Sequence, residues 1–281
     1  MEKFFRALAL AAAVAAAAAP ARAASEGAAA LDAVLAAARP EDGCQASAIA
    51  ATRARLSATA LPLAGRFVLV NIPSGTLTAY QDGEPALQMA AVVGSPSSPT
   101  PERGSEIEYV RFNPTWTVPA SILREPAWRR RASDPAFLAE NGFHAYRPDG
   151  REAAPGDAVA RLVQDPGERN VLGQVKFGLR GMGDIYLHDT NDPAAFDESV
   201  RALSHGCVRL ERPVTLAAWL LGVPVDRAEE MLEAGDRADR RLPDRVPVFF
   251  SYFTAWPDAD GRVLYYPDVY GKDSAPACRG R

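Results

Sequence analysis

An excess of basic residues and long apolar runs are both missing from most of this sequence. The chain has 31 Lys and Arg against 35 Asp and Glu, a net charge of −4. General nucleic-acid binding needs a concentrated basic surface, so this balance argues against it. After the N-terminal region, no stretch reaches the roughly 20 apolar residues of a membrane-spanning helix. We therefore expect no nucleic-acid partner and no membrane span in the mature chain.

Residues 1–23 have the pattern of a signal peptide. Lys3 and Arg6 give a positive start, residues 7–19 form a short apolar run, and Ala-Arg-Ala at 21–23 is a small-x-small cleavage site. An Ala-rich helix of the mature fold is the alternative. Cleavage removes three basic residues and one acidic residue, and leaves 258 residues with a net charge of −6. A chain of that length buries a full core, as one large domain or one domain with an insert.

Cysteine is scarce, and the number is odd: Cys44, Cys207 and Cys278. Export implies an oxidising compartment, in which paired thiols become disulfides. Cys44 lies near the mature N-terminus and Cys278 lies three residues from the end, and chain termini often lie close together at a domain surface. We predict that Cys44 and Cys278 form a disulfide, which leaves Cys207 as a free thiol.

The apolar pattern predicts a mixed fold with a mainly β core. Residues 24–65 are rich in Ala, Leu and Arg at helical spacing, which predicts two short helices. Two more helices, each followed by glycine, are predicted at 213–222 and 226–235. Apolar runs between turn signals predict strands in a meander over 67–94, at 107–119, at 173–179, at 184–189 and in a closing hairpin over 246–271.

Residues 121–170 interrupt the β pattern. Asp134 as N-cap, Pro135 in the first turn and Gly142 beyond the end predict a helix, and loop-like sequence follows it. Inserted loops on a β scaffold often close over a site, so we interpret this segment as a capping insert. A surface excursion with no role in the site is the alternative.

The stretch RALSHGCVRLERP, residues 201–213, contains Cys207 and carries the candidate chemistry. A thiol attacks as its thiolate, so it needs a base or a positive environment. His188 is the candidate base, since imidazole titrates in the right range. Arg209 adds positive charge, which favours a thiolate and could hold a substrate carboxylate.

The loop before Cys207 is the candidate oxyanion site. Gly206 allows a tight turn, and the amides of His205, Gly206 and Cys207 could then face a developing oxyanion. Ser204 could hydrogen-bond a loop carbonyl or a histidine. Three other interpretations of Cys207 stay open: a packed structural cysteine, half of a disulfide, or a zinc ligand with His188 and His205, which would supply three of the required positions.

SHGCVRL at 204–210, with IYLHDT upstream at 185–190, resembles the L,D-transpeptidase catalytic domain, the YkuD-type fold. The resemblance extends from about Arg66 to Lys272, and the insert resembles the capping subdomain of large periplasmic Gram-negative enzymes. It implies a β-sandwich-like catalytic domain over 66–272, a short N-terminal region at 24–65 and a tail at 273–281. No separate peptidoglycan-binding module is recognised, which is a departure from that subgroup.

The resemblance also implies a function in the periplasm. Cys207 would attack a peptidoglycan tetrapeptide stem, D-alanine would leave, and an amine of a second stem would accept the acyl group in a 3→3 cross-link. Carbapenem-type inhibitors would acylate the same cysteine, and Trp116 and Tyr186 would line the pocket. No metal or organic cofactor is implied. An L,D-carboxypeptidase or hydrolase with the same nucleophile is the alternative, and a non-catalytic peptidoglycan-binding protein is another.

Overall fold

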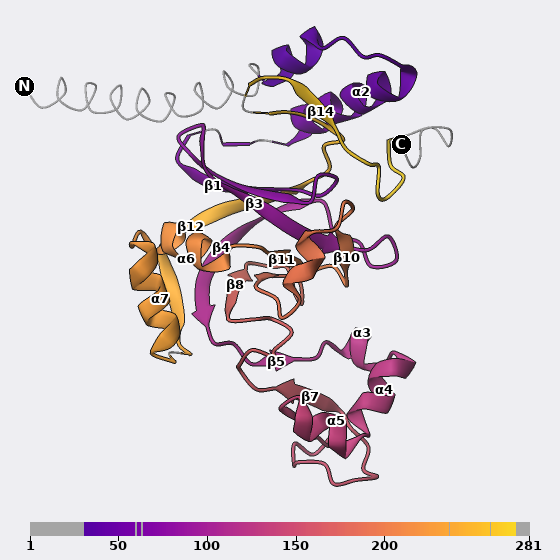
Figure 1. The fold of residues 1–281 in the computed structure, drawn as a ribbon, viewed down its shortest axis with the longest axis vertical. Coiled ribbons are helices and arrows are strands. Elements are labelled where there is room, and N and C mark those ends of the chain that lie inside the picture. The colour runs from indigo at the N-terminus through magenta and orange to yellow at the C-terminus, as the bar shows by residue number, and fades with distance from the viewer. Residues whose placement is uncertain (1–30, 60, 63, 236, 259, 274–281) are drawn as a thin grey trace, which may run out of the picture.

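The computed structural model describes residues 31–273 except 60, 63, 236 and 259. The predicted signal peptide, residues 1–23, and Cys278 lie outside the described residues. In the described part, no helix is long and apolar enough to cross a membrane. The expected mixed, mainly β fold is confirmed: a curved sheet forms the body, with α2 at one end and a smaller helix-containing unit at the other (Figure 1).

The predicted meander forms the first three strands. They are β1 (Arg66–Asn71), β2 (Thr76–Gln81) and β3 (Glu84–Gly94), each antiparallel to its neighbour. Asp82 (φ 53°) and Gly83 (φ 89°) make the turn between β2 and β3. An Asp-Gly pair adopts positive φ at low cost, which is why it predicted a hairpin here.

In the described part of the chain, the main sheet has nine strands in the order β10-β3-β11-β9-β8-β4-β12-β1-β2. Because β3 also pairs with β2, the strands from β3 to β2 close into a barrel-like ring, to which β10 is attached. This ring of strands is the mainly β core that the resemblance implies as a β-sandwich-like domain. The strands not yet named are β4 (Arg103–Phe112), β8 (Val175–Leu179), β9 (Leu187–His188), β10 (Ala202–Ser204), β11 (Val208–Leu210) and β12 (Asp239–Ser251).

Strand β1 is buried on both faces, as its continuous apolar sequence predicts. Val68 and Val70 lie in the main core, whereas Phe67 and Leu69 pack under the N-terminal helices. Residues 31–37 are helical and α2 spans Gly43–Ala58, which confirms two helices before β1. These helices therefore cover the outer face of the barrel.

The insert is larger than its predicted helix and has a sheet of its own. It contains the strands β5 (Trp116–Thr117), β6 (Phe143–Tyr146) and β7 (Arg161–Gln164) and the helices α3 (Ala120–Leu123), α4 (Pro126–Ala132) and α5 (Pro135–Glu140). Asp134 caps α5 as predicted. The single strand predicted over 107–119 is wrong, because Asn113 takes φ 47° and ends the barrel strand β4. The chain then enters the insert sheet at Trp116.

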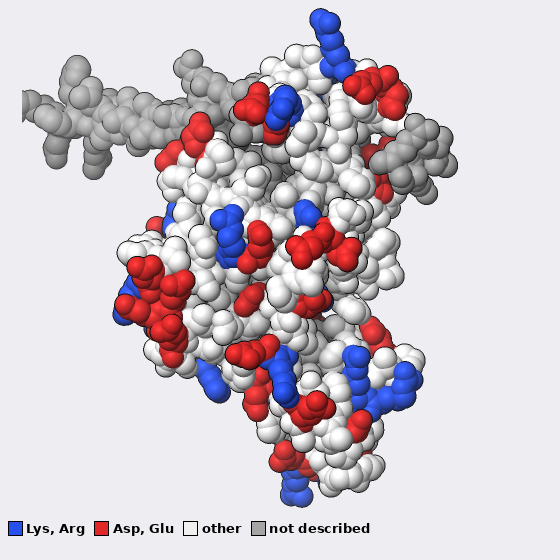
Figure 2. Space-filling model, in the orientation of Figure 1, with Lys and Arg blue, Asp and Glu red and all other residues white. Residues whose placement is uncertain are grey.

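The two C-terminal helices follow the prediction, whereas the hairpin predicted over 246–271 is wrong in its first arm, because residues 246–251 belong to β12, which pairs with β4 and β1. Helices α6 (Pro213–Leu221) and α7 (Val225–Glu233) pack on the barrel, and Gly222 ends α6 in the left-handed conformation. Strands β13 (Ala255–Pro257) and β14 (Val263–Tyr265) form the closing hairpin, and η1 (Pro193–Phe196) is a short 3-10 turn. On the face shown in Figure 2, acidic side chains gather over α7 and basic side chains gather over α4. This face of the molecule therefore carries charges of both signs.

Candidate active site

Two short paired strands bring the predicted nucleophile and base together. Strands β9 and β11 run parallel, with Leu187 opposite Val208 and His188 opposite Arg209. Cys207 immediately precedes β11, and both Cys207 and His188 line one cavity. The chain segments are thus held in register by main-chain hydrogen bonds, including one of 3.1 Å from the Val208 amide to the Tyr186 carbonyl.

His188 is buried, with 4% of its surface exposed. Its Nδ1 hydrogen-bonds to the main-chain carbonyl of Asp189. Burial, and then the positive charge of Arg209, lower the pKa of His188 to about 3. The sequence-based expectation of a ring that titrates near neutral pH is therefore wrong. The imidazole is neutral at pH 7, and a neutral ring whose Nδ1–H donates keeps a lone pair on Nε2 for a proton.

Cys207 is half-buried and is a free thiol. Its Sγ donates to the main-chain carbonyl of Asp184 at 3.1 Å. Burial raises the pKa of Cys207 to about 11, against the smaller opposite effects of the Tyr186 amide, Lys176 and Arg209. Arg209 acts in the predicted direction and lowers the pKa of Cys207, but desolvation outweighs its charge. Without substrate, the pair is a neutral thiol beside a neutral imidazole.

The loop before Cys207 is fixed by its own hydrogen bonds. The Ser204 hydroxyl donates to the Cys207 carbonyl at 2.5 Å and accepts from the Gly206 amide at 3.0 Å. Of the three amides predicted for the oxyanion site, that of Gly206 is therefore occupied. The amide of Cys207 meets no acceptor among the described residues and stays available. Gly206 has φ 108°, and a Cβ there would lie 2.9 Å from Ile185 Cδ1, so only glycine fits.

Thr100 holds the same loop from outside and was missed by sequence reasoning. Its buried hydroxyl donates to the Gly206 carbonyl at 2.8 Å and accepts from the Gly94 amide at 2.8 Å. Tyr270 completes the contact, because its hydroxyl accepts from the Thr100 amide and donates to the Gly94 carbonyl. In a planar trans peptide the carbonyl and the following amide point in opposite directions. By holding the Gly206 carbonyl in place, the Thr100 hydroxyl therefore also fixes the direction of the Cys207 N–H.

Thr100→Val is expected to slow acylation of Cys207 about tenfold, since losing an oxyanion donor outright costs about 100- to 1,000-fold and this change only misdirects one. Thr100→Ser keeps the hydroxyl and should restore the wild-type rate. The measurement is the rate of covalent adduct formation at saturating inhibitor, which separates the chemical step from binding. Equal saturating rates for the Val and Ser variants would show that Thr100 does not position the amide.

The cavity over Cys207 measures about 140 Å³ and takes its walls from both the barrel and the insert. Trp116 and Tyr186 are both buried and line it, as the resemblance implies. Trp116 packs edge-on against Trp128 of α4. The His205 side chain, which is exposed, lies 3.3 Å from Glu125 Oε1 at the start of α4. The insert thus contacts the loop that precedes Cys207 directly.

The remaining predicted residues are placed as follows. Arg209 lines the cavity, and its Nη1 lies 3.8 Å from Asp192 Oδ2. Cys44 is disulfide-bonded, and Cys278 lies outside the described residues, so their pairing stays a prediction. No group of three or more His, Cys, Asp or Glu among the described residues could hold a metal. His188, His205 and Cys207 therefore do not form the zinc site that the sequence left open.

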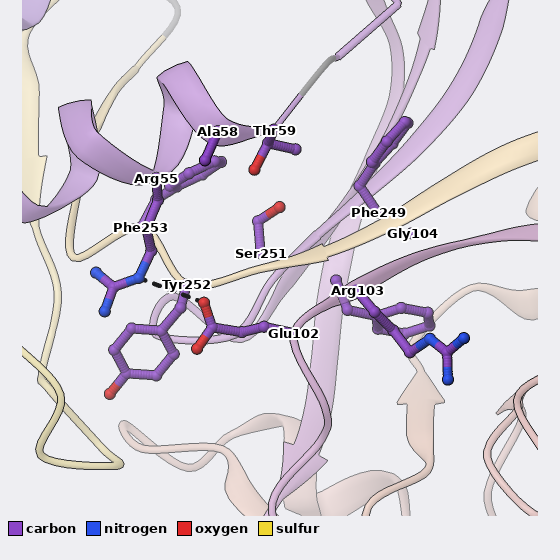
Figure 3. Close-up of a pocket in the computed structure, with 11 residues that line it drawn as sticks. Arg55, Ala58, Thr59, Glu102, Arg103, Gly104, Phe249, Ser251, Tyr252 and Phe253 are labelled. Atoms are coloured by element: carbon purple, nitrogen blue, oxygen red, sulfur yellow. Dashed lines mark ion pairs between the residues drawn. The ribbon is translucent and has the colours of Figure 1, made fainter.

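A larger cavity of about 350 Å³ lies between α2 and the barrel (Figure 3). Its walls hold no cysteine or histidine. Arg55 of α2 reaches across it to Glu102 at 3.3 Å and to Asp273 at 2.5 Å, and lies over the Tyr252 ring. We interpret this cavity as part of the interface between α2 and the barrel.

Comparison with known proteins agrees with the motif. The family model of the L,D-transpeptidase catalytic domain (YkuD) matches residues 65–247. A curated protein of Haemophilus influenzae, named "Putative L,D-transpeptidase", is 32% identical over 218 residues, which cover 73% of this chain and 44% of that protein. The chain thus spans less than half the length of this relative.

Two solved structures with the same kind of name are more distant. An L,D-transpeptidase from Mycobacterium smegmatis is 18% identical, with 67% of this chain and 59% of that chain covered and a TM-score of 0.34. L,D-transpeptidase 3 from Mycobacterium tuberculosis, in complex with a faropenem-derived adduct, is 16% identical, with 66% and 60% covered and a TM-score of 0.36. The family match over residues 65–247, which include the whole Cys207–His188 pocket, decides the assignment: this chain belongs to the family of L,D-transpeptidase catalytic domains.

Proposed function

We propose that this protein is a peptidoglycan L,D-transpeptidase that forms 3→3 cross-links through an acyl-enzyme on Cys207. The observation that carries the proposal is that a free thiol and a buried imidazole line one cavity, with His188 on β9 and Cys207 directly before its paired strand β11. The family of the chain supplies the reaction class. The export signal predicted at residues 1–23 supports action in the periplasm, where the stem peptides of peptidoglycan are exposed.

Acylation begins with a proton transfer inside the pocket. His188 takes the Cys207 proton as Sγ attacks the carbonyl of the third stem residue, so the thiolate forms only when substrate is present. The Cys207 amide, aimed by Thr100, donates to the oxyanion. His188 then passes the proton to the departing amine, the C–N bond breaks, and D-alanine leaves.

Transfer to the second stem reverses these roles. The neutral side-chain amine of a diamino acid attacks the thioester carbonyl, a C–N bond forms, and the C–S bond to Cys207 breaks. His188 takes a proton from the attacking amine and returns it to sulfur. The insert walls of the cavity, which include Ser121 and Ile122, restrict the entry of water, the competing acceptor.

The proposal is tested by product analysis with a purified disaccharide tetrapeptide. Mass spectrometry should show a dimer that equals two substrate molecules less one D-alanine, and sequential fragmentation should place the new bond between the two third residues. A monomeric tripeptide as the sole product would instead make the protein an L,D-carboxypeptidase. Unchanged substrate with folded protein would leave the non-catalytic binding protein as the better description.

A further inference from the structure

A tyrosine near the C-terminus is hydrogen-bonded to the residue that supports the loop before Cys207. The Tyr270 hydroxyl accepts from the Thr100 amide at 3.1 Å and donates to the Gly94 carbonyl at 2.7 Å. The Thr100 hydroxyl in turn donates to the Gly206 carbonyl at 2.8 Å. Tyr270 therefore contacts the residue that fixes the direction of the Cys207 N–H.

These contacts close a ring of three hydrogen bonds. Tyr270 bonds to both Gly94 and Thr100, and the Gly94 amide donates to the Thr100 hydroxyl at 2.8 Å. Because the Thr100 oxygen accepts inside the ring, its single proton is directed out of the ring, to the Gly206 carbonyl. The Tyr270 hydroxyl therefore helps to set the direction in which the Thr100 hydroxyl donates.

Tyr270 is itself held by a second tyrosine. The Tyr252 hydroxyl accepts from the Tyr270 amide at 2.7 Å and donates to Asp268 Oδ1 at 2.6 Å. The two tyrosine rings are stacked, with their centroids 5.4 Å apart. Tyr252 directly follows β12 and is fully buried in the main core. Both the main chain and the ring of Tyr270 are thus fixed to the barrel.

Residues 268–273, the segment that carries Tyr270, are also fastened to α2. The buried carboxylate of Asp273 pairs with Arg55 of α2 at 2.5 Å, and its main-chain carbonyl accepts from the Ser47 hydroxyl of α2 at 2.8 Å. The Asp273 amide donates to Asp268 Oδ2 at 3.0 Å, so one carboxylate joins the fastened end to the second tyrosine. The fold itself therefore places the Tyr270 hydroxyl before any substrate binds.

We infer that Tyr270 is a positioning residue for acylation of Cys207 and acts through Thr100, with Tyr252 holding it in place. This inference rests on the proposed function, because it concerns the oxyanion of that reaction. Tyr270 does not line the cavity over Cys207 and does not meet the substrate there. Its effect is that the Cys207 N–H already points to where the carbonyl oxygen becomes negative, so that no reorganisation is needed during attack.

Two reactions of the same thiol test the inference. Acylation by imipenem passes through an oxyanion, whereas in alkylation by iodoacetamide a C–S bond forms, iodide leaves and no carbonyl oxygen becomes negative. Tyr270→Phe keeps the ring and removes only the hydroxyl. It should slow acylation at saturating imipenem about three- to tenfold, up to the effect expected for Thr100→Val. Alkylation of Cys207 should keep its wild-type rate, because that reaction needs the thiol and His188 but no oxyanion donor.

A double variant tests the route through Thr100. In Thr100→Val the hydroxyl through which Tyr270 acts is already absent, so the further change Tyr270→Phe should not slow acylation again. Tyr252→Phe, which is one contact farther away, should slow acylation less than Tyr270→Phe and should also leave alkylation unchanged. Effects of Thr100→Val and Tyr270→Phe that multiply would overturn this route.

Tyr265→Phe is the matched control. Tyr265 lies in β14 and packs on the N-terminal helices, and its hydroxyl makes no hydrogen bond with the described residues, so both rates should equal those of the wild type. A wild-type acylation rate in Tyr270→Phe, or equal slowing of acylation and alkylation, would overturn the positioning role and leave the proposed function intact. A folded wild type that imipenem does not acylate would overturn the proposed function and this inference with it.

Discussion

Replacing Cys207 with alanine is expected to abolish covalent modification by a carbapenem. Incubation of the wild type with imipenem should add the mass of one inhibitor molecule, and the Cys207→Ala variant should gain none. The reason is that Cys207 is the free thiol of the pocket, whereas Cys44 is already in a disulfide. The oxyanion site and the cavity remain in the variant, but the bond to the inhibitor carbonyl has no sulfur to form on.

This experiment also separates the alternatives for Cys207. Thermal unfolding of the two proteins should agree within a few degrees, because the half-buried Sγ makes a single hydrogen bond, to the Asp184 carbonyl. A packed structural cysteine would show no adduct in either protein and a large loss of stability in the variant. An adduct that persists in Cys207→Ala would place the nucleophile elsewhere.

The second large effect is expected for His188→Gln, which should slow acylation at pH 7 by about 100- to 10,000-fold, the range for loss of a general base. With a pKa of about 11 for Cys207, only about one thiol in ten thousand is ionised at pH 7. In the wild type His188 accepts the proton in concert with the attack, so that a free thiolate need not form first. The variant has no such base and depends on the small fraction of free thiolate.

The acylation rates of the wild type and of His188→Gln should depend differently on pH. A pKa of about 3 for His188 keeps the base neutral, and the thiol stays protonated, over the whole range from pH 5 to 8. The wild-type acylation rate should therefore be flat across that range. In His188→Gln the rate should rise about tenfold per pH unit, because the thiolate fraction does so below its pKa.

The control is His144→Gln, the same substitution in the insert, where His144 is bound to Asp165 at 2.8 Å and lies outside the cavity. It should keep the flat profile and the wild-type rate. A wild-type profile that falls steeply below pH 6.5 would show instead that His188 titrates near its ordinary pKa and that the pocket is more open to water than its burial indicates.

Much of the fold followed from local patterns in the sequence. The meander was predictable because Asp82-Gly83 favours a hairpin and β1 is a continuous apolar run, and α5 because Asp134 and Pro135 start it in the usual way. The end of β4 was not predicted, although Asn113, which has a positive φ, directly follows it. The apolar pattern continues through it into the insert sheet.

The motif located the proposed nucleophile and the proposed base, but not their protonation. Burial sets both pKa values, and burial depends on how the insert and the barrel enclose residues that are 19 positions apart in the chain. Thr100 gave no signal because its contact to Gly206 joins residues 106 positions apart. Lys176 was interpreted only as part of a strand, since nothing local shows that it faces Tyr186.

We expect the pocket to form late in folding, because β3 pairs with β2 and also with β11. The first residues of β3 pair with β2 nearby in sequence, whereas Ala91 and Val92 pair with β11, and the Ala90 amide binds the Glu211 carboxylate 121 residues away. Pairing over such separations forms slowly, because the loop entropy must be overcome before the contacts form. A nascent or partly folded chain therefore has the thiol but no organised site around it. Its reactivity begins only when the ring of strands has closed.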